Sequence, residues 1–467
     1  MDKKTTTIIA VMIVVVVATA VYSIMNDGSD SVEKEDVKYV FEDNDSYLLK
    51  VFGNANGDNA IDSKDVEVIN NLLNGSIEYD KTKHSYADAN QDKAITSEDA
   101  EYIQGIIDKN TSVADRIFYY DVNGDVASVS QPVKKLGADY WPCMDGIVVL
   151  GAQDILTHVD SGIYGQLSSS AVKYKGFGQD KVTNFGSGFG SNYDFETIVA
   201  TGVDAIVCGS KEIYFVGIED RFTSASSIDM IRLPFWEGNK VDSAIITLAY
   251  LLNKDTYISN AEKFLEFEDK IQSTLDKGLS KVTAPKTCLV VYIGTATDKS
   301  LEVEIEARGC GSFEWSVLGG LDNVSKHINS EGALNSASMY YKTDQDYVIT
   351  KNPDYVFILG KAGFNRTAND AQTSFDAGAA YLKTTKSYLN NNIWVTGSGS
   401  ASGTMQKVLA LMLACEVYSD EFSGVDYMGY LQEFVDTFTL ANNGVSSSSS
   451  SYFDVKEDGV WIYHPQV

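Results

Sequence analysis

Basic residues are scarce in this sequence of 467 residues: 37 Lys and Arg stand against 65 Asp and Glu, and the formal net charge is −28. The deficit argues against nucleic acid as a partner, because phosphates are bound through Lys and Arg. The sequence also lacks a Ser/His/Asp set, an HExxH pattern and a Walker nucleotide motif. No catalysis is expected, although the absence of short motifs does not by itself exclude an enzyme with scattered catalytic residues.

Cysteine is also scarce, and its spacing suits neither zinc nor a redox pair. The five cysteines are Cys143, Cys208, Cys288, Cys310 and Cys415. Cys208 and Cys288 lie in apolar runs and are expected in the core. The odd count leaves at least one free thiol, and we predict no disulfide scaffold. No cysteine lies near the N-terminus, which excludes a bacterial-type lipid anchor.

An apolar run near the N-terminus, Ile8–Ile24, predicts export. Its length of about 17 residues is at the short end for spanning a bilayer. Lysines before it and acidic residues after it orient the body outside. Two interpretations remain: an uncleaved transmembrane anchor, which we favour, or a signal peptide cleaved after Ala20. Both place the protein at the cell surface or outside the cell.

Residues 50–110 contain one acidic loop twice, each copy followed by a helical run (66–73 and 100–107). Oxygen atoms recur at positions 1, 3, 5, 7, 9 and 12, as an oxygen-ligated Ca²⁺ shell requires. The candidate ligands of the first loop are Asn54, Asn56, Asp58, Ala60 through its carbonyl, Asp62 and Asp65. Those of the second loop are Asp88, Asn90, Asp92, Ala94 through its carbonyl, Thr96 and Asp99.

This duplicated pattern resembles the dockerin module, which binds cohesin domains. Position 12 is Asp in both copies, as in dockerins. The resemblance implies structural calcium, a cohesin-like partner, and partner recognition by positions 10 and 11. These positions are occupied by Ser63, Lys64, Ser97 and Glu98. The chain departs from the pattern with Asn54 at position 1, and with Asn59 and Lys93 at position 6, where Gly would ease the turn.

Beyond this module, apolar strands alternate with helical segments, which is α/β patterning. Asp121–Asp125 looks like a third calcium loop, but its position 12 would be Pro132. It is better interpreted as a hairpin turn between 117–122 and 126–130. The expected strands are Gly146–Leu150, Ala205–Cys208, Thr287–Ile293, Tyr355–Leu359 and Ile393–Thr396.

A long amphipathic helix is expected over about Thr256–Leu279. Similar patterns lie on either side of it. Glu196 stands eight residues before Asp204, and Asp346 stands eight residues before Asp354, each pattern leading into a buried strand. We interpret the chain as two α/β lobes joined by one helix.

These features resemble the substrate-binding proteins of ABC importers for iron complexes, cobalamin and haem. The resemblance covers about 117–438 and also uses Gln131-Pro132, Gly319-Gly320 and Asn352-Pro353. It implies a ligand between two lobes bridged by one helix. The first half departs from the pattern, because it has Gly202-Val203 at the position where the second half has Asn352-Pro353.

The resemblance further implies that Glu196 and Asp346 dock onto the permease; alternatively, both are helix-start carboxylates favoured by the helix dipole. A ligand pocket combines aromatic walls with a few polar groups. The candidates are Tyr140, Trp141, Phe185, Phe189, Trp236, Arg308, Phe313, Trp315, Tyr340, Tyr341 and Arg366. Each could instead be a core residue. His158 and His327 could ligate a metal centre, although lone histidines are more often structural.

The fold class expected is α/β: two lobes joined by one long helix, preceded by a small all-α dockerin-like module and an N-terminal membrane segment. The expected parts are 1–25 (anchor or signal), 26–49 (spacer), 50–110 (calcium-loop module), 115–240 (first lobe), 241–285 (interlobe helix region), 286–440 (second lobe) and 441–467 (Ser-rich loop and aromatic tail). The function expected is capture of an iron complex, cobamide or haem-type ligand for an ABC permease. The alternatives are a surface adhesion or scaffold protein that acts through dockerin–cohesin binding and, third, an enzyme on the same scaffold.

Overall fold

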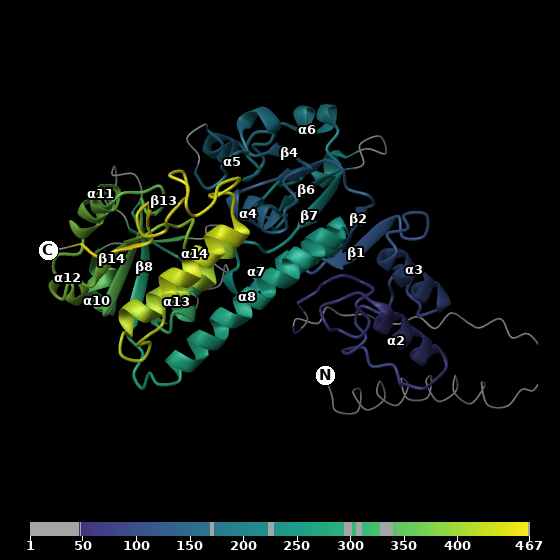
Figure 1. Cartoon of the computed structure of the whole chain (residues 1–467), viewed down its shortest axis with the longest axis horizontal. Coiled ribbons are helices and arrows are strands. Elements are labelled where there is room, and N and C mark those ends of the chain that lie inside the picture. The colour runs from purple at the N-terminus through teal and green to yellow at the C-terminus, as the bar shows by residue number, and fades with distance from the viewer. Residues whose placement is uncertain are drawn as a thin grey trace, which may run out of the picture. The chain divides into compact units, whose positions relative to one another are not determined.

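Figure 1 shows the computed structural model, in which residues 46, 48–168, 172–222, 228–293, 301–304, 311–326, 340–343 and 345–465 are described. Internal contacts divide the chain after Tyr39, and all of these residues belong to one compact unit, Val40–Val467. The expected membrane segment, 1–25, lies outside the described residues, as does nearly all of the spacer. Among the helices that are described, none is both long and apolar enough to cross a membrane.

The calcium-loop module contains two helices of equal length, as its duplicated sequence predicts. They are α2 (Ser63–Leu73) and α3 (Ser97–Ile107). Each begins with a capping box in which the position-9 side chain, Asp62 or Thr96, accepts from the first turn of the helix. The position-12 carboxylate in turn accepts a hydrogen bond from the backbone amide of the cap residue. The calcium loop therefore also forms the start of the helix.

The predicted hairpin follows the module and is confirmed. Its strands are β1 (Arg116–Tyr120) and β2 (Val126–Ser130), paired antiparallel with Tyr120 opposite Val126. Gly124 takes a left-handed φ of 78° in the turn between them. The start of the module pairs with this hairpin: Val51 bridges Tyr119, and the Phe52 amide donates to the Phe118 carbonyl at 2.9 Å.

The first lobe is built on a parallel five-stranded sheet of order β5-β4-β3-β6-β7. Its strands are β3 (Leu136–Ala138), β4 (Leu156–Val159), β5 (Thr183–Asn184), β6 (Ala205–Cys208) and β7 (Asp229–Arg232). Its helices are α4 (Trp141–Val149), α5 (Ser161–Gln166), α6 (Phe195–Thr201) and α7 (Val241–Leu252). The predicted strand Ala205–Cys208 is confirmed as β6.

The predicted strand Gly146–Leu150 is wrong, because these residues belong to helix α4 and its C-cap. Pro142 in the first turn suits a helix start. Every residue from Pro142 to Val149 is buried. A helix buried on all sides shows no 3.6-residue period, so its short apolar run looked like a buried strand.

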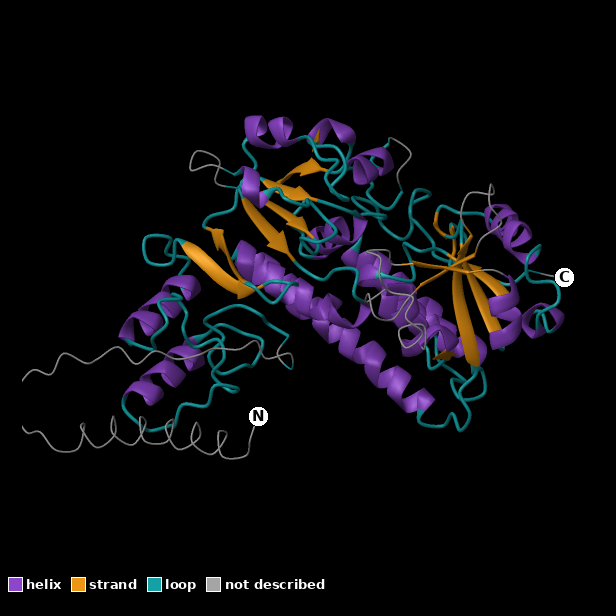
Figure 2. Ribbon diagram, turned by 180° about the vertical axis from the view of Figure 1, so that it is seen from behind, coloured by secondary structure: helices purple, strands orange, loops and turns teal. Residues whose placement is uncertain are grey.

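The long helix is α8 (Asp255–Leu279), one residue longer than predicted. Its cap is Lys254, and Asn253 in a left-handed conformation (φ 45°) separates it from α7. The buried stripe includes Phe264 and Ile271. Figures 1 and 2 show α8 running from the first lobe to the second, so the expected bridging helix is present.

The second lobe has a mixed sheet of order β11-β9-β8-β12-β14-β16, with β10 also paired to β8. Its strands are β8 (Thr287–Ile293), β9 (Leu301–Glu304), β10 (Asp322–Asn323), β11 (Tyr340–Thr343), β12 (Tyr355–Leu359), β14 (Ile393–Thr396) and β16 (Ile462–Tyr463). Its helices are α9 (Gly311–Leu318), α10 (Gln345–Lys351), α11 (Ala368–Ala379), α12 (Lys386–Leu389), α13 (Gln406–Val417) and α14 (Tyr427–Phe438). The three strands predicted here, now β8, β12 and β14, are confirmed residue for residue.

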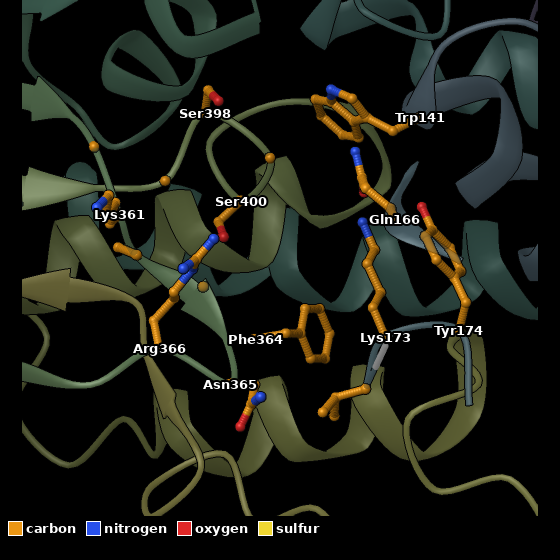
Figure 3. A pocket seen from close by; sticks show the side chains of 16 residues that line it. Trp141, Gln166, Lys173, Tyr174, Lys361, Phe364, Asn365, Arg366, Ser398 and Ser400 are labelled. Carbon is orange, nitrogen blue, oxygen red and sulfur yellow. The ribbon is translucent and has the colours of Figure 1, made fainter. Parts of the chain in front are cut away.

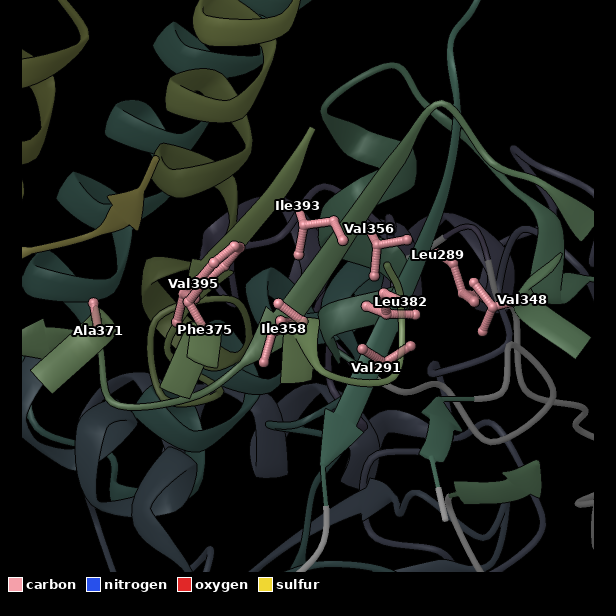
Figure 4. Packing of buried hydrophobic residues seen from close by; sticks show 11 residues of the cluster. Leu289, Val291, Val348, Val356, Ile358, Ala371, Phe375, Leu382, Ile393 and Val395 are labelled. Carbon is pink, nitrogen blue, oxygen red and sulfur yellow. The ribbon is translucent and has the colours of Figure 1, made fainter. Parts of the chain in front are cut away.

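The core of the second lobe lies where the central strands meet α11. Leu289 of β8, Ile358 of β12 and Val395 of β14 pack with Phe375 of that helix (Figure 4). Strands that are buried on both faces read as continuous apolar runs, which explains why these three were visible in the sequence.

The two lobes repeat one local arrangement around an aspartate. Asp204 precedes β6 and accepts from the Lys135 amide at 2.8 Å; Asp354 precedes β12 and accepts from the Thr287 amide at 3.0 Å. In both lobes the donor lies just before or at the start of the neighbouring parallel strand. A seven-residue helix, α6 or α10, comes before each aspartate. The acid-plus-eight pattern therefore marks an internal structural repeat.

The aromatic tail closes one edge of the second lobe. β16 pairs antiparallel with β14, and β15 (Gly459–Val460) pairs antiparallel with β13 (Gly363–Phe364). Trp461 is buried, and its ring lies 5.1 Å from that of Phe364. The tail, which had no place in the sequence pattern, is thus part of this lobe.

Candidate functional site

A cavity of about 550 Å³ lies between the lobes (Figure 3). The first lobe contributes the end of α5 and the loop after it, together with the first residue of α4. The second lobe contributes two loops. The lining side chains with polar or aromatic groups are Trp141, Gln166, Lys173 and Tyr174 on one side, and Lys361, Phe364, Asn365, Arg366, Ser398 and Ser400 on the other.

The second-lobe wall follows directly from the strand order. Residues 360–366 come after β12, and residues 397–400 come after β14, its parallel neighbour. The carboxyl ends of adjacent parallel strands meet at one sheet edge, which is where open α/β sheets bind ligands. Gly397 permits the close approach of the two loops, because a Cβ there would lie 2.4 Å from the Ala362 carbonyl oxygen.

The cavity is lined by three cations, and no carboxylate is among the described residues that line it. Lys361 and Arg366 are exposed and form no ion pair with any described side chain. Figure 3 shows the Arg366 guanidinium reaching toward Ser400. These groups present positive charge and hydroxyl donors to whatever occupies the cavity.

Lys173 is held differently. Its ammonium lies 2.6 Å from Asp145 Oδ2, and the Tyr174 hydroxyl donates to Asp145 Oδ1 at 2.8 Å. Burial raises the pKa of Asp145, and the nearby Lys173 ammonium opposes that rise. The same ammonium lies 5.2 Å from the centroid of the Trp141 ring and 5.9 Å from that of Phe364. Lys173 therefore joins aromatic walls from both lobes through cation–π contacts.

The sequence-predicted ligand residues are dispersed. Trp141 and Arg366 line the cavity, one from each lobe. Phe185, Trp236, Phe313 and Trp315 are buried in the lobe cores. Tyr140 packs beside Trp141 at 5.4 Å between ring centroids, and Phe189 is 58% exposed on its Gly-rich loop. Arg308 lies outside the described residues, as do the side chains of Tyr340 and Tyr341, whose backbone forms part of β11.

Sequence reasoning missed Lys173, Lys361, Phe364 and the serines of the cavity. A usable signal was present: both second-lobe loops are rich in Gly and Ser and directly follow predicted parallel strands. For Lys173 there was none, since nothing in the sequence relates the loop after α5 to a lobe almost two hundred residues away.

The two histidines proposed as metal ligands have different outcomes. His158 is buried on β4, and its ring nitrogens lie 2.7 Å from Thr157 Oγ1 and 2.6 Å from Thr201 Oγ1. Burial lowers its pKa. Both nitrogens are thus engaged within the first lobe. His327 lies outside the described residues.

The proposed docking acids occupy equivalent positions. Glu196 is exposed in the first turn of α6, and Asp346 is exposed in the first turn of α10. Each helix is followed by the repeated aspartate, Asp204 or Asp354, and then by a buried strand. The structure thus presents one accessible carboxylate on corresponding helices of the two lobes.

The two calcium loops share one set of internal hydrogen bonds. At position 5, the Asp58 amide donates to Asn54 Oδ1 at 3.2 Å, and the Asp92 amide donates to Asp88 Oδ1 at 3.1 Å. The amide at position 9 of each loop donates to the position-12 carboxylate at 2.8 Å. These bonds turn the backbone of both loops around the side chains at positions 1 and 12.

Buried acids inside the loops fit a divalent cation. Asp65, Asp88 and Asp99 are almost fully buried, and burial raises the pKa of Asp65 and Asp99 to about 6 and that of Asp88 to about 7. A bound cation would offset the cost of burying these charges. In the described part of the chain, no three His, Cys, Asp or Glu side chains gather as a metal site. Either shell therefore needs its Asn, Thr and carbonyl oxygens as well.

Position 6 adopts a left-handed backbone in both loops, with φ of 69° at Asn59 and 76° at Lys93. Asn tolerates this region, whereas a residue such as Lys is strained there by about 1–2 kcal/mol. The departure noted at Lys93 thus falls where an unusual conformation is required. The proposed partner-recognition residues Ser63, Lys64, Ser97 and Glu98 are exposed at the starts of α2 and α3.

The comparisons with known proteins agree with these two parts. Residues 53–108 match the family model of the dockerin type I domain. A comparison by sequence with curated proteins gives no match.

Solved structures resemble most of the chain at low identity. The TroA-like periplasmic binding protein FepB from Veillonella parvula has a TM-score of 0.53 and 16% identity, covering 75% of this chain and 99% of that chain. CeuE from Helicobacter pylori with Ni(II) bound has a TM-score of 0.51 and 16% identity, covering 69% of this chain and 95% of that chain. MolA from Haemophilus influenzae bound to molybdate has a TM-score of 0.52 and 12% identity, covering 69% of this chain and 97% of that chain. Such identities show the fold alone. Residues 53–108 are therefore a dockerin type I domain, and the two lobes that follow have the fold of TroA-like periplasmic binding proteins.

Proposed function

We propose that this protein is the solute-binding component of an ABC importer and captures a solute with anionic oxygen groups between its lobes. The observation that carries the proposal is the charge of the cavity: Lys361 and Arg366 line it without an ion pair to any described side chain, in a chain whose net charge is −28. Lys173 also lines the cavity, but Asp145 compensates its charge. A cleft lined by one sign of charge concentrates ligands of the opposite sign.

The ligand classes that suit this cavity are anionic iron complexes, cobamides and haem-type tetrapyrroles. Haem carries carboxylates and a cobamide carries a phosphate, so each offers oxygen atoms to Lys361, Arg366 and the serines. A volume of about 550 Å³ is in the range of pockets for organic ligands. Trp141 and Phe364 provide apolar walls for the rest of such a ligand. The structures similar to this chain include a molybdate-bound protein, so a small oxyanion belongs in the test.

Delivery and attachment complete the proposal. Glu196 and Asp346 would dock the loaded protein onto basic residues of a permease. The dockerin domain would bind a cohesin-like partner in the presence of Ca²⁺, held by the ligand sets of its two loops. At the cell surface, this attachment would fix the binding protein to another protein.

A titration tests the solute-binding function directly. The purified chain is mixed with a ferric catecholate siderophore, haem, a cobamide and molybdate, and tryptophan fluorescence is followed, since Trp141 lines the cavity. Arg366→Glu should weaken binding of the ligand at least tenfold, because a charge-assisted hydrogen bond contributes about 1.5–3 kcal/mol. Lys383→Glu is the matched control, since Lys383 is exposed on the same lobe and does not line the cavity.

The second candidate is an adhesion or scaffold protein that works through its dockerin domain, and the match over residues 53–108 favours it. Flat titrations with all four ligands, together with calcium-dependent capture by a purified type I cohesin, would select this function instead. Binding of one ligand that Arg366→Glu weakens and Lys383→Glu leaves unchanged would select transport.

A further inference from the structure

One face of α7 in the first lobe contacts the dockerin domain and the residues just before it. Ser243, Thr247 and Tyr250 are spaced by four and three residues, which places them on one side of the helix. The hydroxyls of the first two bond the backbone of residues 48–50 at 2.5 and 3.1 Å. The amide of Ile61 donates to the hydroxyl oxygen of Tyr250 at 3.1 Å. The lobe thus bonds directly to a residue inside the first calcium loop.

The contact continues past the end of α7. Asn253, between α7 and α8, donates from its side-chain amide to the Ile106 carbonyl at 3.1 Å. Lys109 pairs with Asp255, the first residue of α8, at 2.6 Å. Figure 1 shows the module next to this end of the long helix. The dockerin domain therefore bonds to the corner from which the interlobe helix starts.

The bond to Tyr250 falls on the peptide group that carries a calcium ligand. Position 7 of the first loop is Ala60, whose carbonyl oxygen is the candidate ligand. That carbonyl and the Ile61 amide form one planar peptide group. An acceptor on the amide side fixes the direction of the carbonyl and increases the negative charge on its oxygen. Tyr250 is thus placed to orient a ligand that it does not touch.

The second loop offers a comparison within the same domain. Its matching peptide joins Ala94 to Ile95. Among the hydrogen bonds of the described residues, none starts from the Ile95 amide and none joins Ile61 to Ile95. The two loops share the bonds described above at positions 5 and 9, although the second loop also has a bond from the Lys93 amide to Asp88 Oδ2 at 3.0 Å. The tyrosine is the difference between them that the lobe supplies.

We propose that Tyr250 is a positioning residue of the first calcium loop, contributed by the solute-binding body, so that calcium in this loop and the α7–α8 corner stabilise each other. The inference rests on the calcium binding proposed above. Coupling of this kind is reciprocal: whatever Tyr250 adds to calcium affinity, calcium adds to the stability of the lobe that carries Tyr250. Calcium binding by the dockerin domain would then change the stability of the first lobe.

The test uses the full chain and Tyr250→Phe, which keeps the ring and removes the acceptor. Tyr257→Phe is the matched control at the same corner, because it removes a hydroxyl whose partners are Asp154 at 2.9 Å and Lys254 at 3.3 Å, both outside the dockerin domain. All five tryptophans lie in the lobes, so their fluorescence reports unfolding of the lobes alone. Chelator competition measures calcium affinity in chains that also carry Asp92→Ala, which disables the second loop.

Tyr250→Phe should weaken the remaining calcium site about three- to tenfold, as expected for one hydrogen bond. It should also reduce the calcium-induced rise in the melting temperature of the lobes, and Tyr257→Phe should change neither quantity. A parent chain without any calcium response would refute calcium binding and this inference together. Equal affinities and equal melting shifts with and without the hydroxyl would refute the coupling alone. Destabilisation by Tyr250→Phe of the same size with and without calcium would make Tyr250 an ordinary residue of the lobe and also overturn the proposal.

Discussion

Replacing Lys407 with Met should loosen the junction of the two lobes with the long helix. Lys407 lies on α13 of the second lobe, 2.9 Å from Asp242 Oδ2 on α7 and 3.0 Å from Glu268 Oε2 on α8. Glu268 is 3% exposed, and its Oε1 has no hydrogen-bond partner among the described residues. One ammonium therefore compensates two carboxylates where three helices meet.

The size of the effect depends on pH. Burial raises the pKa of Glu268 from 4.5 to about 8, although the Lys407 ammonium opposes the rise. An acid whose pKa is higher in the folded than in the unfolded protein stabilises the fold fully at a pH below the unfolded pKa. This stabilisation is lost as the pH rises through the folded pKa. Without Lys407 the folded pKa rises further, and the loss continues above pH 8. At pH 9 we expect Lys407→Met to destabilise the protein by about 3–5 kcal/mol, the cost of leaving a buried charge unpaired. The loss at pH 6 should be smaller.

Urea unfolding followed by tryptophan fluorescence measures this free energy. Adding Glu268→Gln to the Lys407→Met chain should recover at least half of the loss at pH 9, because the amide carries no charge to bury. Unchanged unfolding at pH 9 after Lys407→Met would refute the reasoning, and so would a double variant no more stable than the single one.

Three further predictions follow from the same structure. Calcium affinity should rise between about pH 5 and 8, because Asp88 (pKa about 7) and Asp99 (pKa about 6) must lose protons to bind the metal; a flat profile in chelator competition would contradict this. Without calcium the effect of pH has the opposite sign, because burying the ionised acids is costly, and the domain should lose stability as the pH rises from about 5 to 8. Reversing the charge of both Glu196 and Asp346 should abolish uptake by cells and leave ligand affinity intact, whereas weakened ligand binding would place them in the cleft. Gly146→Ala should lower the free energy of unfolding in urea by about 1–3 kcal/mol, since its Cβ would lie 2.3 Å from a buried aromatic ring; an unchanged midpoint would show that the ring can move.

Features that depend on the spacing of residues close together in the chain were predictable from the sequence. The two loops follow one residue pattern, as a calcium shell would require because each oxygen must reach a common centre. Both helices were predicted, but they begin at position 10 of the pattern, three residues before the predicted runs 66–73 and 100–107. β8, β12 and β14 are short apolar runs with clear ends and were placed to the residue. The repeat around Asp204 and Asp354 was visible because the same eight-residue interval precedes both.

Features that depend on distant contacts were not predictable. α4 is buried on every side, so no helical period marks it. Aromatic residues were proposed for the cleft because aromatic walls are common in pockets, yet Phe185 and Trp315 fill lobe cores instead. The cations that define the cavity come from loops far apart in the sequence, and only the folded chain brings Lys173 opposite Arg366.

The tail strand has a consequence for how the protein is made. Phe364, in the wall of the cavity, belongs to β13, whose pairing strand β15 lies roughly a hundred residues later. Chains grow at about 5–20 residues per second, so translation needs roughly 5–20 s to supply that strand. Long-range pairing also forms slowly, because a large loop must close first. The nascent second lobe therefore emerges with one wall of the cavity unfinished and a strand edge open, the state in which a holding chaperone would recognise it.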